Sequence, residues 1–382
     1  MPVYAPSGSG NVHIDVVLTQ ISVAWPNEGL VGQVLFPSVP VNKQSNKYYI
    51  FQGREGWYPA LDDARAPGTE ANELPGLTVS TGSYYCQEHA LQIAVTDEER
   101  ENADSPLSPD VDGAEMLASR VALGKEYRIY NLVTTASNYP SALTVALGDA
   151  ATASYGPHWD GLTNAGAATA TPPTPVRDIR QAMRALHRTS FLNANLAIIP
   201  YLVMSALEDA TDFINRIQYV ERAILTPDLV ASLLSLSNVV VPGFGIATNN
   251  PGQTLALSYL WNKEVLLAYN PPRPGLKVPA YGYQFTQGYS GGGGGGLGFG
   301  SGAFSGEGID NGPHGNLNPT SGDTSRSSNL TGSIVDRWRE ERRASDIVRL
   351  RQRYDLELIG LDSNNKSICG FLFTTAVSSG FA

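Results

Sequence analysis

The stretch Val348-Arg-Leu-Arg-Gln-Arg-Tyr-Asp-Leu-Glu-Leu358 alternates apolar and polar side chains along its length. Successive side chains of a β-strand point to opposite faces, so this alternation predicts a strand with one buried face. The predicted buried face consists of Val348, Leu350, Tyr354, Leu356 and Leu358, and the opposite face of Arg349, Arg351, Arg353, Asp355 and Glu357. At about 3.3 Å per residue the strand would be roughly 35 Å long.

A helix of similar length is predicted from Asp112 to about Thr135. Asp112 and Glu115, three residues apart, resemble a capping box at its start. An apolar stripe at helical spacing predicts the buried face: Met116, Leu123, Tyr127 and Tyr130, flanked by Leu117 and Val121. A long helix beside a long strand predicts an elongated body.

The N-terminal region predicts an arm and a projecting hairpin. The first 45 residues contain turn formers and short apolar pieces, which favours an extended arm. Two predicted strands, Lys47–Phe51 and Tyr84–Val95, are separated by the long polar stretch Gln52–Gly76. A two-stranded finger of this kind cannot bury its own faces in water, so we expect it to lie on another surface.

The middle of the chain alternates predicted helices and strands, which indicates a mixed α/β unit. Thr174 and Pro175 begin a helix whose buried face is Val176, Ile179, Met183 and Leu186, and Thr226 caps another. The other predicted segments here are Leu196–Ile199, Pro200–Leu207, Asp228–Leu234, Val239–Val241 and Glu264–Tyr269. A Gly-rich tract follows, with 13 glycines among residues 288–312.

Composition excludes several classes of protein. The 382 residues are 42% hydrophobic and 16% charged, which is typical of a folded chain rather than a disordered one. A net charge of −10 argues against a dedicated nucleic-acid binder, although a local basic patch remains compatible with it. The two cysteines, Cys86 and Cys369, are too few for a disulfide framework or a structural zinc site. No secretory signal and no apolar run of about twenty residues is present, so we expect a protein made in a cytoplasm, without a membrane partner.

Enzymatic motifs are weak. Gly288-Tyr-Ser290-Gly-Gly292 matches the G-x-S-x-G pattern of serine hydrolases, but a glycine run follows where that motif needs a helix. The five histidines are scattered without metal-binding spacing, and no phosphate-binding glycine motif lies between a strand and a helix. We therefore expect no enzyme, no cofactor and no metal, with a hydrolase using Ser290 as the alternative from a different class. The acidic segment Asp97–Glu101 is interpreted as a solvated turn.

An arginine cluster is the most informative set of charges. Seven arginines and four acids lie between Asp336 and Arg353. One interpretation is a surface strand with salt-bridged neighbours, and another is a phosphate-binding face. The sharper hypothesis is a subunit interface, because arginines pair with carboxylates in bidentate geometry and repel one another when unmatched. The hypothesis joins an acidic set on the finger (Glu55, Asp62, Asp63, Glu70 and Glu73) to a basic set on another copy (Arg342, Arg343, Arg349, Arg351 and Arg353).

Six segments, in order, resemble the major capsid proteins of tailed bacteriophages, which have the Hong Kong 97-like fold. They are Leu35–Val41 before Lys47–Phe51, Pro175–Ile179, Asp212–Tyr219, Leu260–Leu267 with Tyr269, and Tyr281–Phe285. The resemblance extends from about Ile21 to Phe373, nearly the whole chain.

This resemblance implies an α+β fold and names for its parts. The implied parts are an N-terminal arm (1–45), an E-loop hairpin (46–95), a peripheral domain with a long spine helix (96–190), an axial α/β domain (191–288), a Gly-rich loop (289–333) and peripheral return strands (334–382). It implies a major capsid protein that self-assembles without covalent links into hexamers and pentamers of an icosahedral head in the host cytoplasm. The head would enclose double-stranded DNA without sequence-specific binding, with scaffold, portal and decoration proteins as further partners.

Two departures from the family bear on assembly. No lysine occurs from Tyr48 to Gly124, so we expect no lysine–asparagine cross-link from the E-loop. No scaffold-like segment precedes the arm, so scaffolding would come from another polypeptide or from a part already removed. An encapsulin-like shell, which has the same fold but encloses enzymes, is an alternative, as is a monomeric surface-binding module.

Overall fold

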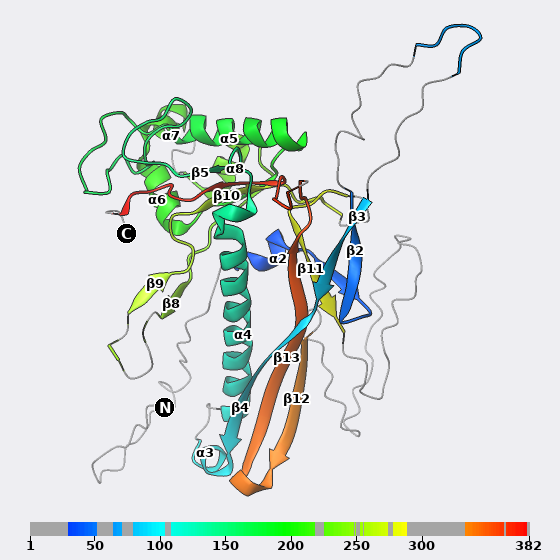
Figure 1. The fold of residues 1–382 in the computed structure, drawn as a ribbon. Coiled ribbons are helices and arrows are strands. Elements are labelled where there is room, and N and C mark those ends of the chain that lie inside the picture. The colour runs from blue at the N-terminus through cyan, green and yellow to red at the C-terminus, as the bar shows by residue number, and fades with distance from the viewer. Residues whose placement is uncertain are drawn as a thin grey trace, which may run out of the picture.

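The computed structural model describes eleven stretches of the chain, and the fold below refers to them. They are residues 30–51, 64–70, 79–103, 108–217, 225–247, 249, 253–254, 256–273, 278–288, 333–362 and 364–379. The described chain has an elongated body and a head at one end of it (Figure 1). It mixes helices with two larger sheets, which confirms the α+β class.

The body is built on the predicted long strand, β13 (Ser345–Leu358). It pairs antiparallel with β12 (Ser333–Glu340), β4 (Gln87–Thr96) and β11 (Gly282–Gln287). The short 3-10 turn η3 (Glu341–Arg343) joins β12 to β13. Burial along β13 alternates as expected: Val348, Leu350 and Tyr354 are buried, while the arginines between them are half-exposed.

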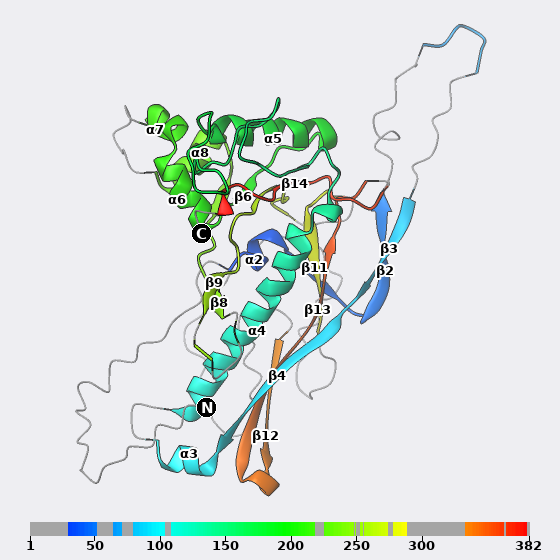
Figure 2. The same ribbon diagram turned by 60° about the vertical axis from the view of Figure 1, so that its left-hand side comes forward.

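One face of this sheet is covered by the long helix α4 (Pro109–Thr134), which lies along it (Figure 2). Leu117 and Val121 pack against Val348 and Leu350 in a small core. The short helix α3 (Asp97–Glu101) joins β4 to α4, and the 3-10 turn η2 (Ala136–Asn138) follows α4.

The predicted helix exists, but its start and its buried face are corrected. It begins at Pro109, because proline fits the first helical turn, rather than at Asp112. Met116 and Tyr127, expected to be buried, are 52% and 49% exposed, whereas the flanking Leu117 and Val121 are buried. The sheet covers the neighbouring helical face, so the predicted stripe is only partly buried, at Leu123 and Tyr130.

The predicted finger is the antiparallel hairpin of β2 (Ser45–Phe51) and β3 (Val79–Tyr85). The predicted single strand Tyr84–Val95 is corrected, because β3 ends at Tyr85 and β4 begins at Gln87. The chain leaves one sheet and enters another at Cys86, whose side chain is buried and whose N–H donates to the carbonyl of Gln44. The base of the hairpin packs on the body through Tyr84, Cys86 and Phe285.

The head surrounds the largest core. Its sheet has the order β5 (Thr144–Val145), β14 (Gly370–Phe373), β10 (Val265–Ala268), β6 (Leu196–Ile198) and β7 (Asn238–Val240). Its helices are α5 (Pro175–Ser190), α6 (Tyr201–Asp209), α7 (Thr211–Ile217) and α8 (Pro227–Leu234). A separate hairpin, β8 (Gly245–Ala247) and β9 (Leu257–Tyr259), leaves the head on the side of α4 (Figure 1). The mixed α/β prediction for this region is confirmed element by element.

Part of the predicted arm belongs to the body instead. Within residues 1–45, the structure describes α2 (Gly32–Leu35) and β1 (Ser38–Val41), which pairs parallel with β11. Val31, Leu35 and Phe36 are buried in the largest core, and the N–H of Gly32 donates to the buried Glu126 carboxylate at 2.5 Å. The two elements are only four residues long, too short to produce a periodic signal, so an extended arm was the wrong expectation for residues 30–41.

Within the described stretches, no helix combines the length and hydrophobicity that crossing a membrane requires. The same stretches contain no group of three or more metal-ligating side chains. Most of the Gly-rich tract lies outside them.

Candidate functional site

The arginines of the predicted basic set lie on the face of the β12–β13–β4 sheet opposite α4, or at its end. Arg349 and Arg351 both donate to Asp336 on β12, with Nη2 of Arg349 2.9 Å from Oδ2 and Nη2 of Arg351 3.1 Å from Oδ1. Burial by itself would raise the pKa of Asp336, but the hydrogen bonds from Arg349 and Arg351 outweigh it and lower that pKa. Arg349 also lies over the ring of Trp338, 4.9 Å from its centroid.

Arg353 pairs with a strand on the other side. Its Nε and Nη2 lie 2.8 and 2.7 Å from Oε2 of Glu88 on β4, and Arg351 reaches the same carboxylate at 3.8 Å. Three arginines on one strand face are thus matched by Asp336 and Glu88 of their own chain. The charge repulsion that motivated the interface hypothesis is therefore already relieved within the subunit.

Arg342 and Arg343 differ from these three. Both lie in η3, at the end of the body farthest from the head, and both are exposed. Arg343 makes a loose ion pair with Glu340 at 3.7 Å, and Arg342 has no ion pair in the described stretches. These two are the arginines of the predicted set best placed to meet another molecule.

The acidic partners proposed for them are mostly outside the described residues. Glu55, Asp62, Asp63 and Glu73 all lie outside, and so does Ser290. Glu70 is described and is exposed. Within the described residues, Glu70 makes no ion pair with the arginines, and the structure does not place the other four members of the acidic set.

A second charge network, missed by the sequence analysis, holds the same end of the body together. Arg100 Nη2 lies 2.9 Å from Asp110 and 3.0 Å from Asp346, joining α3, the first turn of α4 and β13. Arg337 bonds Asp346 at 2.9 Å, and Arg339 bonds both oxygens of Asp97. Hydrogen bonds from Arg339 and Arg337 lower the pKa values of Asp97 and Asp346, respectively.

The acidic segment that was interpreted as a solvated turn is therefore a short capped helix with a defined partner. The Thr96 hydroxyl accepts from the N–H of Glu99, and the Glu99 carboxylate accepts from the N–H of Thr96. The T-x-x-E spacing of a capping box was present in the sequence and could have identified this helix.

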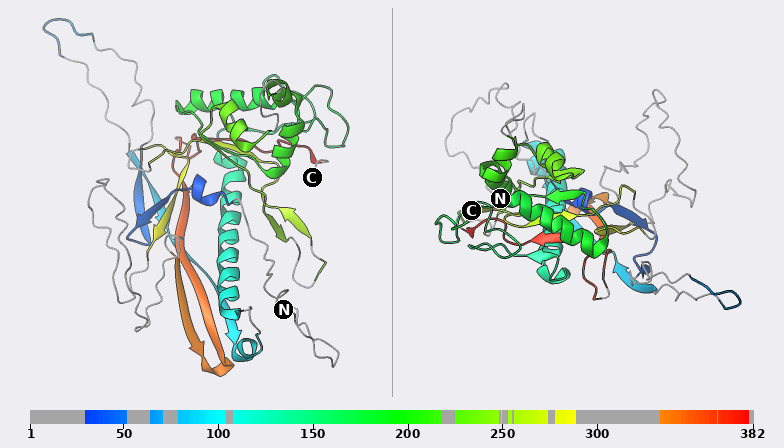
Figure 3. Two further views of the ribbon diagram at one scale, coloured as in Figure 1. Left: turned by 180° about the vertical axis from the view of Figure 1, so that it is seen from behind. Right: turned by 90° about the horizontal axis from the view of Figure 1, so that it is seen from above.

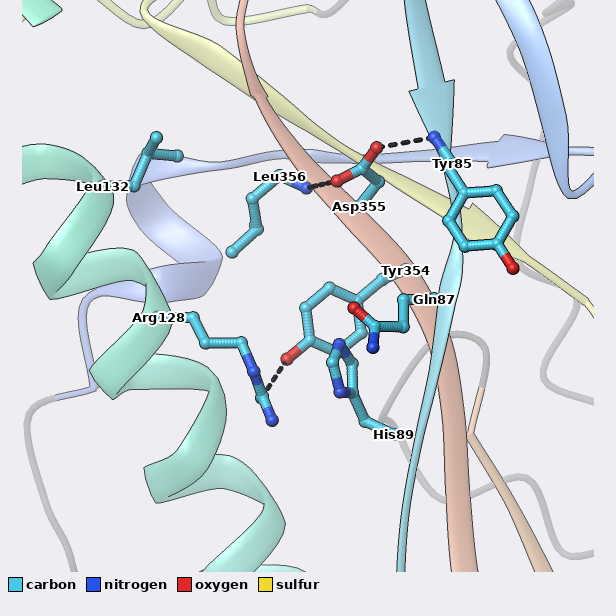
Figure 4. Close-up of a pocket in the computed structure, with 8 residues that line it drawn as sticks. All are labelled: Tyr85, Gln87, His89, Arg128, Leu132, Tyr354, Asp355 and Leu356. Carbon is cyan, nitrogen blue, oxygen red and sulfur yellow. Dashed lines mark hydrogen bonds between the residues drawn. The ribbon is translucent and has the colours of Figure 1, made fainter.

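A pocket of about 260 Å³ opens between α4, β4 and β13 (Figure 4). Nη1 of Arg128 donates to the Tyr354 hydroxyl at 2.7 Å, and His89 packs against the Tyr354 ring at 4.8 Å. Burial, followed by the charge of Arg128, lowers the pKa of His89. The Asp355 carboxylate accepts from the N–H groups of Tyr85 and Leu356. Arg128 and Tyr354 thus bond to each other and Asp355 bonds to the backbone, an arrangement that stabilises the junction of helix, hairpin and sheet.

The base of the hairpin lies beside this pocket. The rings of Tyr84 and Tyr48 lie 4.7 and 5.3 Å from that of Phe285. Burial, followed by the charge of Asp355, raises the pKa of Glu357 to about 7. Burial, followed by the charges of Glu357 and Asp355, raises the pKa of Tyr48 to about 12. Two carboxylates and an aromatic cluster thus meet where the hairpin joins the body.

Comparison with known proteins identifies what kind of molecule this surface belongs to. No family model matches the chain. The chain is similar to the major capsid protein of Burkholderia phage BcepMu, with 22% identity over 275 residues that cover 71% of this chain and 82% of the relative. It is also similar to the major capsid protein of Pseudomonas phage JBD67, with 27% identity over 33% of this chain and 40% of the relative. This chain is a major capsid protein of the tailed-phage type.

Solved structures agree with the fold of a major capsid protein. A phage-related protein of Bordetella bronchiseptica RB50 aligns with a TM-score of 0.57 at 18% identity, covering 92% of this chain and 94% of its own. The capsid protein in the capsid structure of cyanophage P-SCSP1u aligns with a TM-score of 0.54 at 9% identity, covering 97% and 96%. The capsid protein is a structural component of the virion capsid and not an enzyme, as the weak motifs predicted.

Proposed function

We propose that this major capsid protein assembles without covalent links into hexamers and pentamers of an icosahedral head around double-stranded DNA. In that icosahedral shell the β2–β3 hairpin of the subunit is the E-loop and α4 is the spine helix of the peripheral domain. The part of the subunit that contains the β5–β14–β10–β6–β7 sheet is the axial domain. Residues 1–29 of the predicted N-terminal arm (1–45) lie outside the described stretches.

The observation that carries this proposal is the β2–β3 hairpin. A two-stranded hairpin is marginally stable in water unless a larger surface supports it. Its base has such support, from the small core around Phe285. Tyr49 and Tyr85 on the hairpin are 64% and 59% exposed, so the described residues leave their rings uncovered, as is typical of surfaces that another molecule covers.

Particle formation tests the proposal. The full chain should form closed shells, or rings of five and six, in negative-stain microscopy and sedimentation, with nuclease-protected DNA rather than a cargo enzyme inside. Denaturing gels should show single chains, because no covalent link joins subunits. A variant in which a short Gly-Ser turn replaces residues 52–78 should keep its thermal unfolding midpoint but fail to form particles.

The matched control keeps residues 52–78 and replaces Tyr201, which lies on the head, by serine. A wild-type chain that stays monomeric at all concentrations and salt conditions would contradict self-assembly. Particles formed equally well without residues 52–78 would remove the hairpin from the assembly contact.

We further propose that the acidic set of the hairpin (Glu55, Asp62, Asp63, Glu70 and Glu73) contacts the basic set of an adjacent subunit. Arg342 and Arg343 would supply most of the attraction, because Arg349, Arg351 and Arg353 are already matched by Asp336 and Glu88. Opposite charges at exposed positions favour register and association rate and are screened by salt.

Two charge reversals separate the roles of the arginines. Arg342→Glu with Arg343→Glu should weaken assembly and its salt dependence while leaving the subunit folded. Arg351→Glu should instead lower the thermal unfolding midpoint, because it places a third carboxylate beside Asp336 and Glu88. If assembly and its salt dependence survive both reversals unchanged, the charge contact is refuted.

A further inference from the structure

The exposed face of α5 carries a row of arginines. Arg177, Arg184 and Arg188 are seven and four residues apart, so they lie on one face of the helix. All three are exposed, and the row is about 16 Å long at 1.5 Å per residue. The opposite face, with Val176, Ile179, Ala182 and Leu186, is buried in the head. We call the three residues the α5 arginine row.

No carboxylate of the described stretches neutralises the α5 arginine row with an ion pair. The only acid in the helix, Asp178, is completely buried and accepts hydrogen bonds from Gly156 N at 3.0 Å and Trp159 Nε1 at 3.1 Å. The arginines of the β12–β13–β4 sheet contrast with this, since each of the three on β13 has a carboxylate partner within its own chain. In a chain of net charge −10, the row is a local concentration of positive charge.

Helix stability does not explain the row. A cation in the last turn, such as Arg188, interacts favourably with the helix dipole. Arg177 lies in the first turn, where a positive charge is unfavourable. The helix dipole therefore accounts for Arg188 but not for Arg177, whose charge instead helps to lower the pKa of the buried Asp178.

The surroundings of α5 leave the row accessible. Seen from above, α5 runs across the head with no other helix or strand of the described chain over it (Figure 3, right). At its C-terminal end Phe191 is 57% exposed in a left-handed conformation (φ 55°), with its ring 6.1 Å from that of His187. A strained, exposed aromatic residue next to the row is consistent with a functional surface.

We infer that the α5 arginine row contacts the phosphate backbone of double-stranded DNA inside the shell, and that the head presents α5 to the lumen. A straight row of guanidinium groups on a rigid helix fits a long linear polyanion, and each can donate two hydrogen bonds to a phosphate. The contact is independent of base sequence, because it involves only phosphates. The inference rests on the proposed function, since DNA is the polyanion that this shell would contain.

An acidic protein segment fits the row less well. The acidic residues of the hairpin segment 52–76 are interleaved with Trp57, Tyr58 and Leu61. Between Arg177 and Arg188 this exposed face adds only the polar Gln181, and the exposed ring of Phe191 lies beyond its C-terminal end. DNA needs no such apolar surface.

Salt-dependent DNA binding tests the inference. Fluorescence anisotropy would measure binding of a labelled duplex of about 30 base pairs to the full chain, between about 50 and about 200 mM NaCl. The row variant is Arg177→Gln with Arg184→Gln and Arg188→Gln. The control variant is Lys43→Gln with Arg120→Gln and Arg273→Gln, which removes the same charge from exposed positions elsewhere. If the chain purifies as closed shells, nuclease-protected nucleic acid per subunit is compared instead.

The logarithm of the DNA association constant falls linearly with the logarithm of the salt concentration. Because the row supplies three phosphate contacts, this slope should be steeper by about 3 in the wild type than in the row variant. The control variant should keep the wild-type slope, or the wild-type nucleic-acid content. Equal duplex binding by the row variant and the wild type would overturn the inference, and so would a wild type that does not bind the duplex. A labelled peptide of residues 52–76 is measured in the same way, and a wild type that binds this peptide in place of DNA would also overturn the inference. Sedimentation of each variant records particle formation separately, so loss of DNA contact is distinguished from loss of assembly.

Discussion

At the scale of single residues, Asp178 shows how a charged side chain can serve the core of the head. Its carboxylate is completely buried between α5 and the loop that contains Trp159. Burial raises its pKa, and the hydrogen bonds from Gly156 and Trp159 oppose that rise. The carboxylate stabilises the core because it accepts hydrogen bonds from two N–H donors that are buried with it.

Replacing Asp178 by alanine should destabilise the subunit by about 2–4 kcal/mol, because two buried donors lose their partner. Asp178→Asn keeps one acceptor oxygen and should cost less. Differential scanning fluorimetry of the two variants measures the difference. Equal unfolding midpoints for Asp178→Ala and the wild type would show that the donors find other partners.

Glu357 makes the junction of hairpin and body sensitive to pH. Burial and Asp355 raise its pKa to about 7, above the unfolded value of about 4.5. The folded state therefore binds more protons than the unfolded state between these values, so this group reduces stability as pH rises from about 4.5 to about 7.

Glu357→Gln should abolish that part of the pH dependence and raise the unfolding midpoint at pH 8 relative to the wild type. The two proteins should converge well below pH 4.5, where Glu357 is protonated in both states. Thermal unfolding across this range measures the difference. A wild-type curve parallel to that of Glu357→Gln would mean that Glu357 titrates normally.

At the scale of elements, the N-terminal segment is fixed by a close approach of strands. A Cβ on Gly282 of β11 would lie 2.4 Å from the Phe36 ring and 2.8 Å from the carbonyl oxygen of Glu357 on β13. The glycine therefore lets Phe36 lie directly against the sheet, edge-on to Tyr281 at 5.8 Å between centroids. This contact ties α2 and β1 to the body.

Gly282→Ala should displace Phe36 and destabilise the subunit by about 1–3 kcal/mol, the usual cost of overpacking a core. The same substitution at Gly148, where a Cβ would meet no atom within 4 Å, is the control. Limited proteolysis near residue 40 would report whether the segment detaches. Unchanged protease resistance and an unchanged midpoint would mean that Phe36 can move without cost.

At the scale of the whole molecule, surfaces that the subunit leaves uncovered predict contacts with other subunits. Met116 and Tyr127 lie on one exposed face of α4, away from the sheet. Exposed apolar residues that share a face are typical of surfaces that another protein covers. We therefore expect another subunit to cover that face.

Met116→Glu with Tyr127→Glu should therefore change the free energy of unfolding by no more than about 0.5 kcal/mol, as other surface substitutions do. The same double variant should form fewer particles. Met116→Leu with Tyr127→Phe preserves apolar surface and should assemble normally. Sedimentation of both variants is the measurement. Normal particles from the glutamate variant would show that this face stays exposed in the shell.

The sequence itself determined the elements with strong local signals. Strict alternation from Val348 to Leu358 places every second side chain on one face, so β13 and its buried residues could be predicted. Pro175 and Pro227 lie in the first turns of α5 and α8, and the Thr226 hydroxyl caps α8, as predicted from neighbouring residues alone, whereas the Thr174 side chain makes no capping hydrogen bond. The order of six segments along the chain also identified the capsid fold.

Tertiary structure alone decided which surfaces meet. Helical period groups Met116 with Tyr127 and Leu117 with Val121, but which group is buried depends on where the sheet lies. The partners of the arginines, Asp336 and Glu88, come from strands on opposite sides of β13, a pairing that no local pattern contains. Burial and ion pairing are relations between distant segments, whereas alternation and capping are relations between neighbours, and a sequence read along its length displays only the latter directly.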